Sequence, residues 1–424
     1  MSAPLPNLPE RAALPDWLRG AISQPSAAPA DVQAIAQAQI TTWGLPTLRD
    51  EEWRWTNLRA IMRLPAATAE HTQWQPSPLA TVLPDALVIQ FSAGKLKAIP
   101  ENLPDGLTMT ALNTAEAALR HAAFAPNAAS ANDALLALNT ASAHDGLIID
   151  IAANTSLTRP IVLDWQDDAG TSNHSETRVL IRIGPHSEAT VIESTYATSA
   201  ATHWRNAVSV IHQAANSQLT HISLGLAGAA RLLTDRSFVT LLRDARYRSI
   251  NIQLGGQLVR REIDVDIREP GAHCDLLGLM MPRDKQIMDT HTRVTHAAPH
   301  TTSNEQYQII ADDAGRGIFK GRILVAQDAQ KIEAYQNSRN LLLSNTAEID
   351  TKPELEIYAD DVKCSHGATI GRLDDEALYY LRSRGISRTD ARRLLISGFA
   401  QEIVNALPSP DLVAWMSAQM DASA

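Results

Sequence analysis

One short segment holds the side chains best suited to metal chemistry. Residues 359–373, between the last predicted strand and the C-terminal helices, read ADDVKCSHGATIGRL and contain a thiol, Cys364, and an imidazole, His366. The two residues are two positions apart, so on an extended chain their side chains project from the same side. A thiolate and an imidazole could bind iron, copper or zinc, but two ligands do not complete a site. The remaining ligands would have to come from elsewhere in the fold or from another chain.

The same residues also allow a structural interpretation. In it the segment is a turn, Cys364 packs as a small apolar residue, and His366 bonds a nearby carbonyl group. The spacing alone favours this interpretation over a metal site.

Other groups of residues suggest chemistry but favour structural roles. His291, His296 and His300 are five and four residues apart, which does not match one face of a strand, so we expect polar packing or exposure. Residues 51–61, EEWRWTNLRAI, could bind an aromatic ligand or a partner. The favoured interpretation is that they dock a terminal domain onto its neighbour. Cys274 is expected in the core.

Motifs and composition exclude several classes of function. The sequence has no G-x-x-x-x-G-K-[ST] loop, no strand-linked G-x-G-x-x-G, no G-x-S-x-G elbow and no H-E-x-x-H. We therefore do not expect the chain itself to hydrolyse a nucleotide. Lys and Arg number 37 against 47 Asp and Glu, a net charge of −10, which disfavours nucleic-acid binding.

The cysteine count and the hydropathy pattern indicate a compartment. Two cysteines in 424 residues provide neither a disulfide framework nor four thiolates, which fits a reducing compartment. The N-terminal residues lack the basic and apolar regions of a secretory signal, and no window approaches the roughly 18 apolar residues of a spanning helix. We expect a cytoplasmic protein that does not cross a membrane.

Three compositional zones predict the domains. Residues 1–145 predict an α-rich N-terminal domain with a small β component, because residues 31–42 are amphipathic, residues 86–91 resemble a strand, and residues 111–143 contain 14 alanines. Residues 146–370 predict a β domain, and residues 371–424 a C-terminal helical domain.

The β domain has about fifteen short strand-like runs in succession, with almost no helical pattern between them. This excludes a doubly wound sheet, which needs a helix after each strand. No propeller-like repeat is present. A sandwich of this length would be large for one unit, whereas a solenoid grows one rung at a time. The pattern therefore modestly favours a β-solenoid.

The C-terminal zone predicts three helices. The first ends at Gly385, the second is capped by Ser387 with Asp390 three residues later, and the third follows Pro410.

Long stretches of this sequence resemble the SufB/SufD family of iron-sulfur cluster assembly proteins. The similarity is dense over about 120 residues from Asp289, through THTRVTHAAPHTTSNEQY, GRGIFKGRILVAQDAQKIEAYQNSRNLLLS and TKPELEIYADDVKCSHGATIGRLDDEALYYLRSRGI to ARRLLISGFAQEIV. RDEEWRWTNL near the N-terminus resembles the SufD branch in particular, as does the low cysteine count.

The resemblance implies a right-handed parallel β-helix flanked by N-terminal α-rich and C-terminal helical domains. It also implies a non-catalytic scaffold subunit that pairs with a SufB-like partner, binds a SufC-like ABC-type ATPase through its C-terminal domain, and shares a transient iron-sulfur cluster with the partner. Homodimers of the isolated chain and a reduced flavin in the complex are left open.

Candidate site residues follow from the same resemblance. His366 matches the histidine expected to bind iron at the heterodimer interface, and Cys364 is a weaker candidate ligand or sulfur acceptor. The resemblance places Tyr379, Leu394, Leu395 and Phe399 in the ATPase-docking region, where each is either core or partner-facing.

Two functions from other classes compete with this one. A secreted β-helix carbohydrate lyase or hydrolase would use paired carboxylates, but it predicts a signal peptide and aromatic sugar platforms, and only 5% of the residues are aromatic. A homodimeric binding module without cluster chemistry would use His366 for packing alone.

Overall fold

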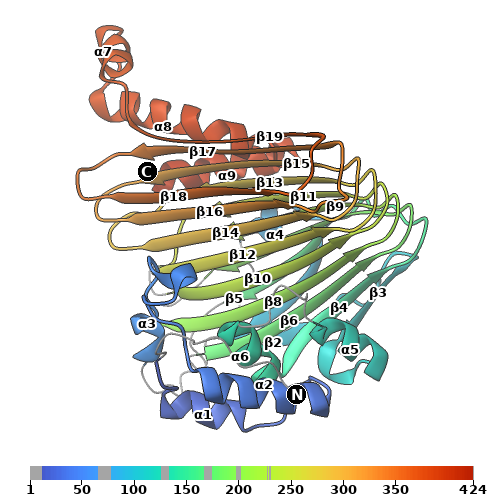
Figure 1. Cartoon of the computed structure of the whole chain (residues 1–424). Helices are drawn as coiled ribbons and strands as arrows, with labels where there is room; N and C mark the ends of the chain where they lie inside the picture. Colours follow the sequence, from blue (N-terminus) through green and yellow to red (C-terminus); the bar gives the residue numbers. More distant parts are fainter. Residues whose placement is uncertain are drawn as a thin grey trace.

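The centre of the protein is a parallel β-helix made of two sheets (Figure 1). The computed structural model describes residues 12–64, 78–125, 133–166, 174–196, 202–226, 228 and 231–423. From β4 to β19, consecutive strands alternate between the sheets and pair in parallel with the strand one rung away. This connectivity confirms the predicted solenoid and excludes the sandwich.

The first sheet has ten strands and the second has nine. The first comprises β1 (Leu87–Ser92), β2 (Lys95–Ala98), β5 (Ile161–Gln166), β7 (Glu188–Tyr196), β9 (Gln218–Gly225), β11 (Arg246–Gln253), β13 (His273–Met280), β15 (Thr302–Ala311), β17 (Ile332–Leu342) and β19 (Val362–Arg372). The second comprises β3 (Leu107–Ala111), β4 (Asp145–Ile151), β6 (His174–Ile183), β8 (His203–Gln213), β10 (Arg231–Leu241), β12 (Leu258–Ile267), β14 (Ile287–His296), β16 (Arg316–Val325) and β18 (Glu348–Ile357).

Helices lie before and among the first strands, and others follow β19. They are α1 (Asp16–Ile22), α2 (Ala30–Trp43), η1 (Glu51–Trp53), α3 (Arg59–Met62), α4 (Leu79–Val82), η2 (Leu112–Thr114), α5 (Ala117–Phe124), α6 (Ala134–Ser142), α7 (Asp375–Ser383), α8 (Arg388–Val404) and α9 (Pro410–Ser423). None of the helices within the described ranges is both long and apolar enough to cross a membrane.

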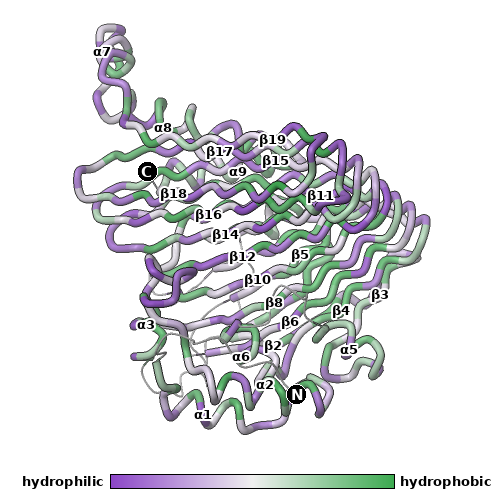
Figure 2. The backbone as a smooth tube through the Cα atoms, viewed as in Figure 1, coloured by the Kyte–Doolittle hydropathy of each residue, from purple (hydrophilic) through white to green (hydrophobic). Residues whose placement is uncertain are grey.

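The β-helix has one apolar layer in its interior and one on the outer face of each sheet. Hydrophobic and hydrophilic stretches alternate along the strands (Figure 2), because successive side chains of a strand point to opposite faces. Inward-facing residues such as Ile263, Cys274 and Phe319 form the interior core. The outer face of the first sheet packs against α8 and α9, and that of the second packs against α1, α2 and α6. Cys274 is thus a core residue, as predicted.

Local sequence signals explain several turns and helix ends. Asn216 and Asp244 adopt positive φ between consecutive strands, a conformation that Asn and Asp tolerate better than most residues. His300 takes the same conformation in the turn after β14. The hydroxyl of Ser387 accepts a hydrogen bond from the backbone N–H of Asp390, which confirms the predicted cap of α8.

The structure corrects the sequence prediction at one important element. The strand pattern ended near residue 359, yet residues 362–372 form β19, so the turn interpretation of this segment is wrong. Most of its side chains are exposed, because the strand is the last of its sheet and no further strand of the described residues pairs with it. Without a buried face, the apolar alternation that marks a strand is missing. The strand predicted at residues 86–91 is confirmed as β1, and the alanine-rich stretch contains α5 and α6, although its residues 126–132 lie outside the described part.

Candidate functional site

His366 and Cys364 lie on the last strand of the β-helix. β19 pairs with β17 in parallel, which sets His366 beside Gln336 and Cys364 beside Ala334. Within the described residues, neither β19 nor β18 has a strand on its other side. The two candidate ligands therefore stand at the open end of the solenoid, next to a free strand edge.

The environments of the two side chains differ. His366 is exposed, whereas Cys364 is half-buried and packs against an apolar cluster that includes Ile332 and Ala334. Burial raises the pKa of the Cys364 thiol, so the reactive thiolate is disfavoured in this chain alone. No set of three His, Cys, Asp or Glu side chains within the described ranges could hold a metal ion. Any site at this end would therefore need ligands from outside the described residues.

The C-terminal helices present two kinds of apolar side chain. Tyr379 on α7 is 74% exposed and Leu394 on α8 is 51% exposed. Leu395 is half-buried, and Phe399 packs beside the core under the guanidinium group of Arg339. Tyr379 and Leu394 are therefore free to contact a partner, whereas Phe399 is largely committed to its own fold.

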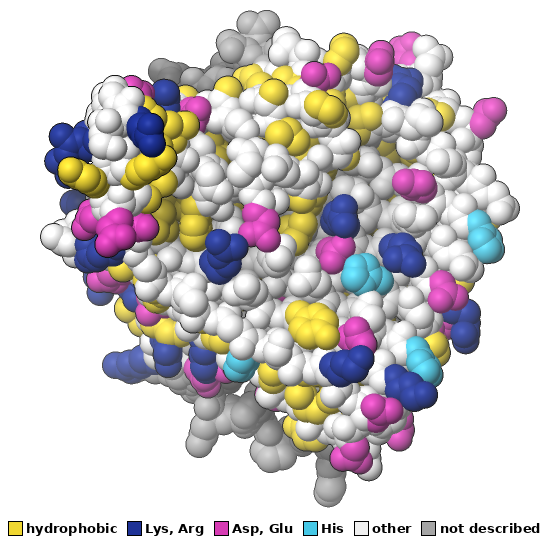
Figure 3. Space-filling view, turned by 90° about the horizontal axis from the view of Figure 1, so that it is seen from above, with side chains coloured by type: hydrophobic (Ala, Val, Ile, Leu, Met, Phe, Trp, Pro, Cys, Tyr) yellow, Lys and Arg dark blue, Asp and Glu magenta, His cyan; other side chains and the backbone are white. Residues whose placement is uncertain are grey.

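Figure 3 looks down on the molecule from the end that carries β19 and α7. Exposed hydrophobic side chains lie there among charged and histidine side chains, without one dominant charge. Tyr335, Tyr358 and Ile370 are among the exposed large apolar residues of the last rungs. No local sequence signal marks these residues as exposed, because their exposure depends on where the solenoid stops.

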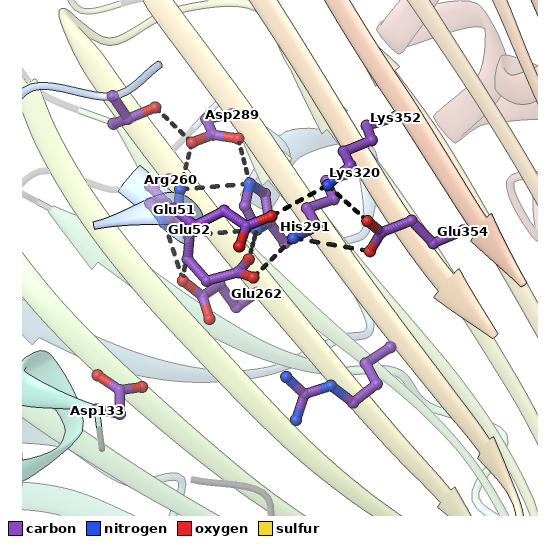
Figure 4. Close-up of polar contacts among 12 residues, drawn as sticks. Glu51, Glu52, Asp133, Arg260, Glu262, Asp289, His291, Lys320, Lys352 and Glu354 are labelled. Atoms are coloured by element: carbon purple, nitrogen blue, oxygen red, sulfur yellow. Dashed lines mark hydrogen bonds and ion pairs between the residues drawn. The ribbon is translucent and has the colours of Figure 1, made fainter. Parts of the chain in front are cut away.

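A second concentration of charge lies where the N-terminal segment crosses the second sheet (Figure 4). A pocket of about 380 Å³ opens here, lined by Glu52, Arg236, Glu262, His291 and Lys320 among others. Glu52 accepts a hydrogen bond from Lys320 Nζ at 2.6 Å, and its carboxylate lies 3.5 Å from the Nδ1 atom of His291. These residues join η1 to β14 and β16.

A buried layer beneath the pocket completes the network. Asp289 is bonded by Arg260 at 2.5 Å, by His291 at 3.0 Å and by the Thr56 hydroxyl. The Arg260 guanidinium carbon also lies 3.9 Å from the Trp53 ring centroid. The predicted docking role of residues 51–61 is therefore confirmed.

The pKa values in this network follow from its ion pairs. The hydrogen bond from His291, followed by contacts with Lys320, holds the pKa of Glu52 well below its ordinary value. Burial acts to raise the pKa of Asp289, but Arg260 and His291 outweigh it and lower the value to about 2. Burial and Arg260 act to lower the pKa of His291, yet Asp289 and Glu52 raise it overall. Each of these charges is compensated, as expected of a structural network.

His296, the second histidine of the predicted cluster, is also structural. His296 is buried, with Nδ1 at 2.7 Å from the Thr301 hydroxyl and Nε2 at 2.9 Å from the Ser303 hydroxyl. Burial lowers its pKa to about 4, so it is neutral at neutral pH. The expected polar packing is confirmed for both His291 and His296.

Comparisons with known proteins agree on one family. Residues 166–399 match the family model described as SUF system FeS cluster assembly, SufBD core domain, and residues 87–163 match the SufBD protein N-terminal region. The chain is 32% identical over 374 residues to the iron-sulfur cluster assembly protein SufD of Escherichia coli K12, covering 87% of each chain. It is 32% identical over 386 residues to the SufBD family protein slr0076 of Synechocystis, covering 87% of this chain and 85% of that one. The chloroplastic protein ABCI7 of Arabidopsis thaliana is 27% identical over 386 residues, which cover 88% of this chain and 81% of the relative.

Proposed function

Because this chain belongs to the SufBD family of iron-sulfur cluster assembly proteins, we propose that it is a SufD-like scaffold subunit on which a cluster is built. It acts in a complex with a SufB-like chain and a SufC-like ATPase, and ATP hydrolysis takes place in that separate subunit. Membership of this family gives no support to the alternative of a carbohydrate lyase or hydrolase. The two free thiols, Cys274 and Cys364, suit the cytoplasm.

The free edge of β19 beside His366 is the observation that carries this proposal. An unpaired edge offers a row of backbone donors and acceptors, and proteins use such edges for pairing with another chain. A SufB-like β-helix that ends in the same way would extend both sheets across the junction. His366 and Cys364 would then face side chains of the partner across the interface.

The chemistry of the two side chains fits a shared and transient cluster. A neutral His366 imidazole offers one ring nitrogen to iron, and the partner supplies the remaining ligands. Cys364 is the weaker ligand, because its raised pKa means that iron must first displace its proton. If sulfur arrives at the zero-valent level, its reduction to sulfide needs electrons, which a reduced flavin in the complex could supply.

Exposed side chains of the C-terminal helices support docking of the ATPase. Tyr379 and Leu394 are the best anchors, since large apolar side chains are rarely left this exposed without a partner. Leu395 and Phe399 contribute mainly by holding the helices together. In this proposal residues 371–424 are the docking domain.

The test is to co-express the chain with SufB-like and SufC-like partners and to purify the complex without oxygen. Iron and acid-labile sulfide are then compared for the wild type, His366→Ala and His121→Ala. His121 is an exposed histidine on α5, at the other end of the molecule (Figure 1), so it is a matched control. We expect His366→Ala to lose most of its iron and sulfide while His121→Ala keeps both.

The amount of complex recovered and its thermal unfolding are recorded on the same samples. An intact His366→Ala complex with unchanged iron and sulfide would refute the ligand role.

Light scattering of the isolated chain shows whether it forms homodimers. If the homodimer dissociates when the SufB-like partner binds, the result supports use of the same β19 edge for homodimer formation and for partner binding. A homodimer that persists alongside a bound partner would contradict it.

A further inference from the structure

A buried carboxyl group lies two rungs beneath His366. In the strand register, Glu305 of β15 stands beside Gln336 of β17, and Gln336 stands beside His366 of β19. Neighbouring strands are about 4.8 Å apart, so Glu305 and His366 are separated by roughly 10 Å with Gln336 between them. The three residues form one column that ends at the open end of the solenoid.

The lower two members of the column point into the β-helix. The Oε2 atom of Glu305 accepts a 2.5 Å hydrogen bond from the hydroxyl of Thr292, which belongs to the opposite sheet. The amide nitrogen of Gln336 lies so close to Gly321, also on the opposite sheet, that a Cβ atom at position 321 would be 2.0 Å from it. Glycine at this position therefore leaves room for the Gln336 amide.

Glu305 has no compensating charge within the described residues. It is fully buried, and its Oε1 atom has no hydrogen-bond partner there. Burial raises its pKa to about 7, although the Thr292 and Gln336 side chains favour its charged form. A buried carboxyl group without a compensating charge destabilises a fold. The position does not require an acid for packing, because Leu276 occupies it one rung below.

Gln336 is similarly unsatisfied. Its side chain is buried, yet neither its amide oxygen nor its amide nitrogen has a geometrically adequate partner within the described part of the chain. An amide has an acceptor end and a donor end, so it can bond two different neighbours at once. Here the neighbours in register are an imidazole above and a carboxyl group below.

We propose that Gln336 and Glu305 are positioning residues for His366. The Gln336 oxygen accepts a hydrogen bond from the ring N–H of His366, and the Gln336 N–H group donates to Glu305. These two hydrogen bonds fix the tautomer and the orientation of the imidazole, and so direct its other ring nitrogen toward iron. Histidines that bind metal commonly donate their second ring N–H in this way, and loss of the acceptor weakens metal binding about 10- to 100-fold. The inference rests on the proposed function of His366.

The first test uses the three-subunit complex. Glu305→Gln and Gln336→Met keep side-chain length and remove the charge and the amide, respectively. Glu193→Gln is the matched control, because Glu193 is an equally buried acid of the same sheet that is bonded to His221 instead. We expect the first two variants to bind Fe²⁺ at least about 10-fold more weakly than the wild type, with normal recovery of the complex. Iron affinity in the control should stay within about twofold.

The second test needs neither partner nor iron. Nitrogen-15 NMR of the histidine side chains in the isolated chain reports the tautomer of His366, whose signals are assigned by their absence in His366→Ala. We expect one dominant tautomer in the wild type and a mixture in Gln336→Met. Gly321→Ala, which crowds the Gln336 amide without touching His366, should produce the same mixture.

The outcomes separate the two proposals. If His366→Ala loses iron while Glu305→Gln, Gln336→Met and the tautomer are all unaffected, the positioning role is refuted and the proposed function stands. If the tautomer responds to Gln336→Met but His366→Ala keeps its iron, the hydrogen-bonded column is supported and the ligand role fails. Equal iron loss in Glu193→Gln would refute the positioning role, because it would show a general effect of buried acids.

Discussion

The guanidinium carbon of Arg260 lies 3.9 Å from the centre of the Trp53 ring, and this contact fastens the N-terminal segment to the outer wall of the β-helix. Arg260 is buried and bonded to Asp289 and Glu262, so the ring rests on a fixed cation. A desolvated cation–π contact contributes about 2 kcal/mol, and loss of the ring adds the cost of a cavity.

We therefore expect Trp53→Ala to destabilise this attachment by about 2–4 kcal/mol. Limited trypsin digestion should then cleave at Arg54 or Arg59 at least about 10-fold faster than in the wild type, as the segment opens locally. Trp55→Ala is the control, because the Trp55 ring contacts Arg54 of its own segment. Equal protection in Trp53→Ala and the wild type would contradict the anchoring role.

The ion pairs around Glu52 predict a pH window for the same attachment. The lowered pKa of Glu52 gives stability that is present above its ordinary value of 4.5 and is lost as the pH falls through the folded-state value. The raised pKa of His291 gives stability that is present below its ordinary value of 6.5 and is lost as the pH rises through the folded-state value. Both contributions are complete only between about pH 4.5 and 6.5.

His291→Gln should therefore lower the thermal unfolding temperature most within this window and progressively less above it. Melting curves of the wild type and the variant from pH 4 to pH 9 measure the difference. His121→Gln, a change at an exposed helix, should follow the wild type throughout. A difference between His291→Gln and the wild type that is constant with pH would rule out this origin.

Local sequence patterns predicted the parts of this protein that local rules control. Short strands without helices between them indicated a solenoid, Ser387 and Asp390 marked the start of α8, and Cys274 was expected in the core. Each of these features depends on residues within a few positions of one another, or on burial of an apolar side chain. All three are confirmed.

The features that were missed depend on register between rungs. Glu305, Gln336 and His366 are about thirty residues apart in sequence, and only the pairing of β15, β17 and β19 brings them into one column. A slip of one residue would turn any of them to the other face. The ion-pair network between residues 51–56 and the second sheet was missed for the same reason. Local patterns contain no information about the register in which one rung pairs with the next.

The raised pKa of the buried Glu305 predicts an unusual dependence of stability on pH. The pKa of Glu305 is about 7 in the fold against an ordinary 4.5, so the folded chain holds this proton more tightly than the unfolded chain does. Its contribution is complete below pH 4.5 and falls as the pH rises to about 7. At 1.36 kcal/mol per pKa unit, the loss is about 3 kcal/mol.

Glu305→Gln should therefore stabilise the isolated chain by up to about 3 kcal/mol at pH 8 and by almost nothing at pH 4.5. Urea unfolding at the two pH values measures this. Glu193→Gln should instead destabilise the chain at pH 8. Burial acts to raise the pKa of Glu193, but the hydrogen bond with His221 outweighs burial and lowers the pKa to about 2. If Glu305→Gln is destabilising at pH 8, the acid is better satisfied than its contacts indicate.

The exposed leucine of α8 should affect binding and not folding. Leu394→Ala removes a side chain that is half exposed, so we expect the melting temperature to change by less than about 1 °C. Binding of the SufC-like ATPase should weaken at least about 10-fold if Leu394 is an anchor at the interface. Ile396→Ala is the contrasting variant, because Ile396 is buried on the same helix and its truncation should cost about 2–4 kcal/mol of stability. Undiminished binding by Leu394→Ala would exclude this face of α8 as the docking site.

The two thiols should react at very different rates. Burial raises the pKa of Cys274 well above its ordinary value of 9.0, with Glu305 and Asp275 adding to the effect, and no part of its side chain reaches the surface. Cys364 is half-buried, and burial raises its pKa as well. Since the thiolate is the reactive form, an aromatic disulfide reagent at pH 7 should label one thiol per chain slowly and the second only in denaturant.

Cys364→Ser should abolish the native reaction, and pairing with a SufB-like partner should slow it at least about 10-fold if the end face becomes buried. Two rapidly labelled thiols in the native chain would contradict the burial of Cys274, whereas an unchanged rate in the complex would place the partner elsewhere on the molecule.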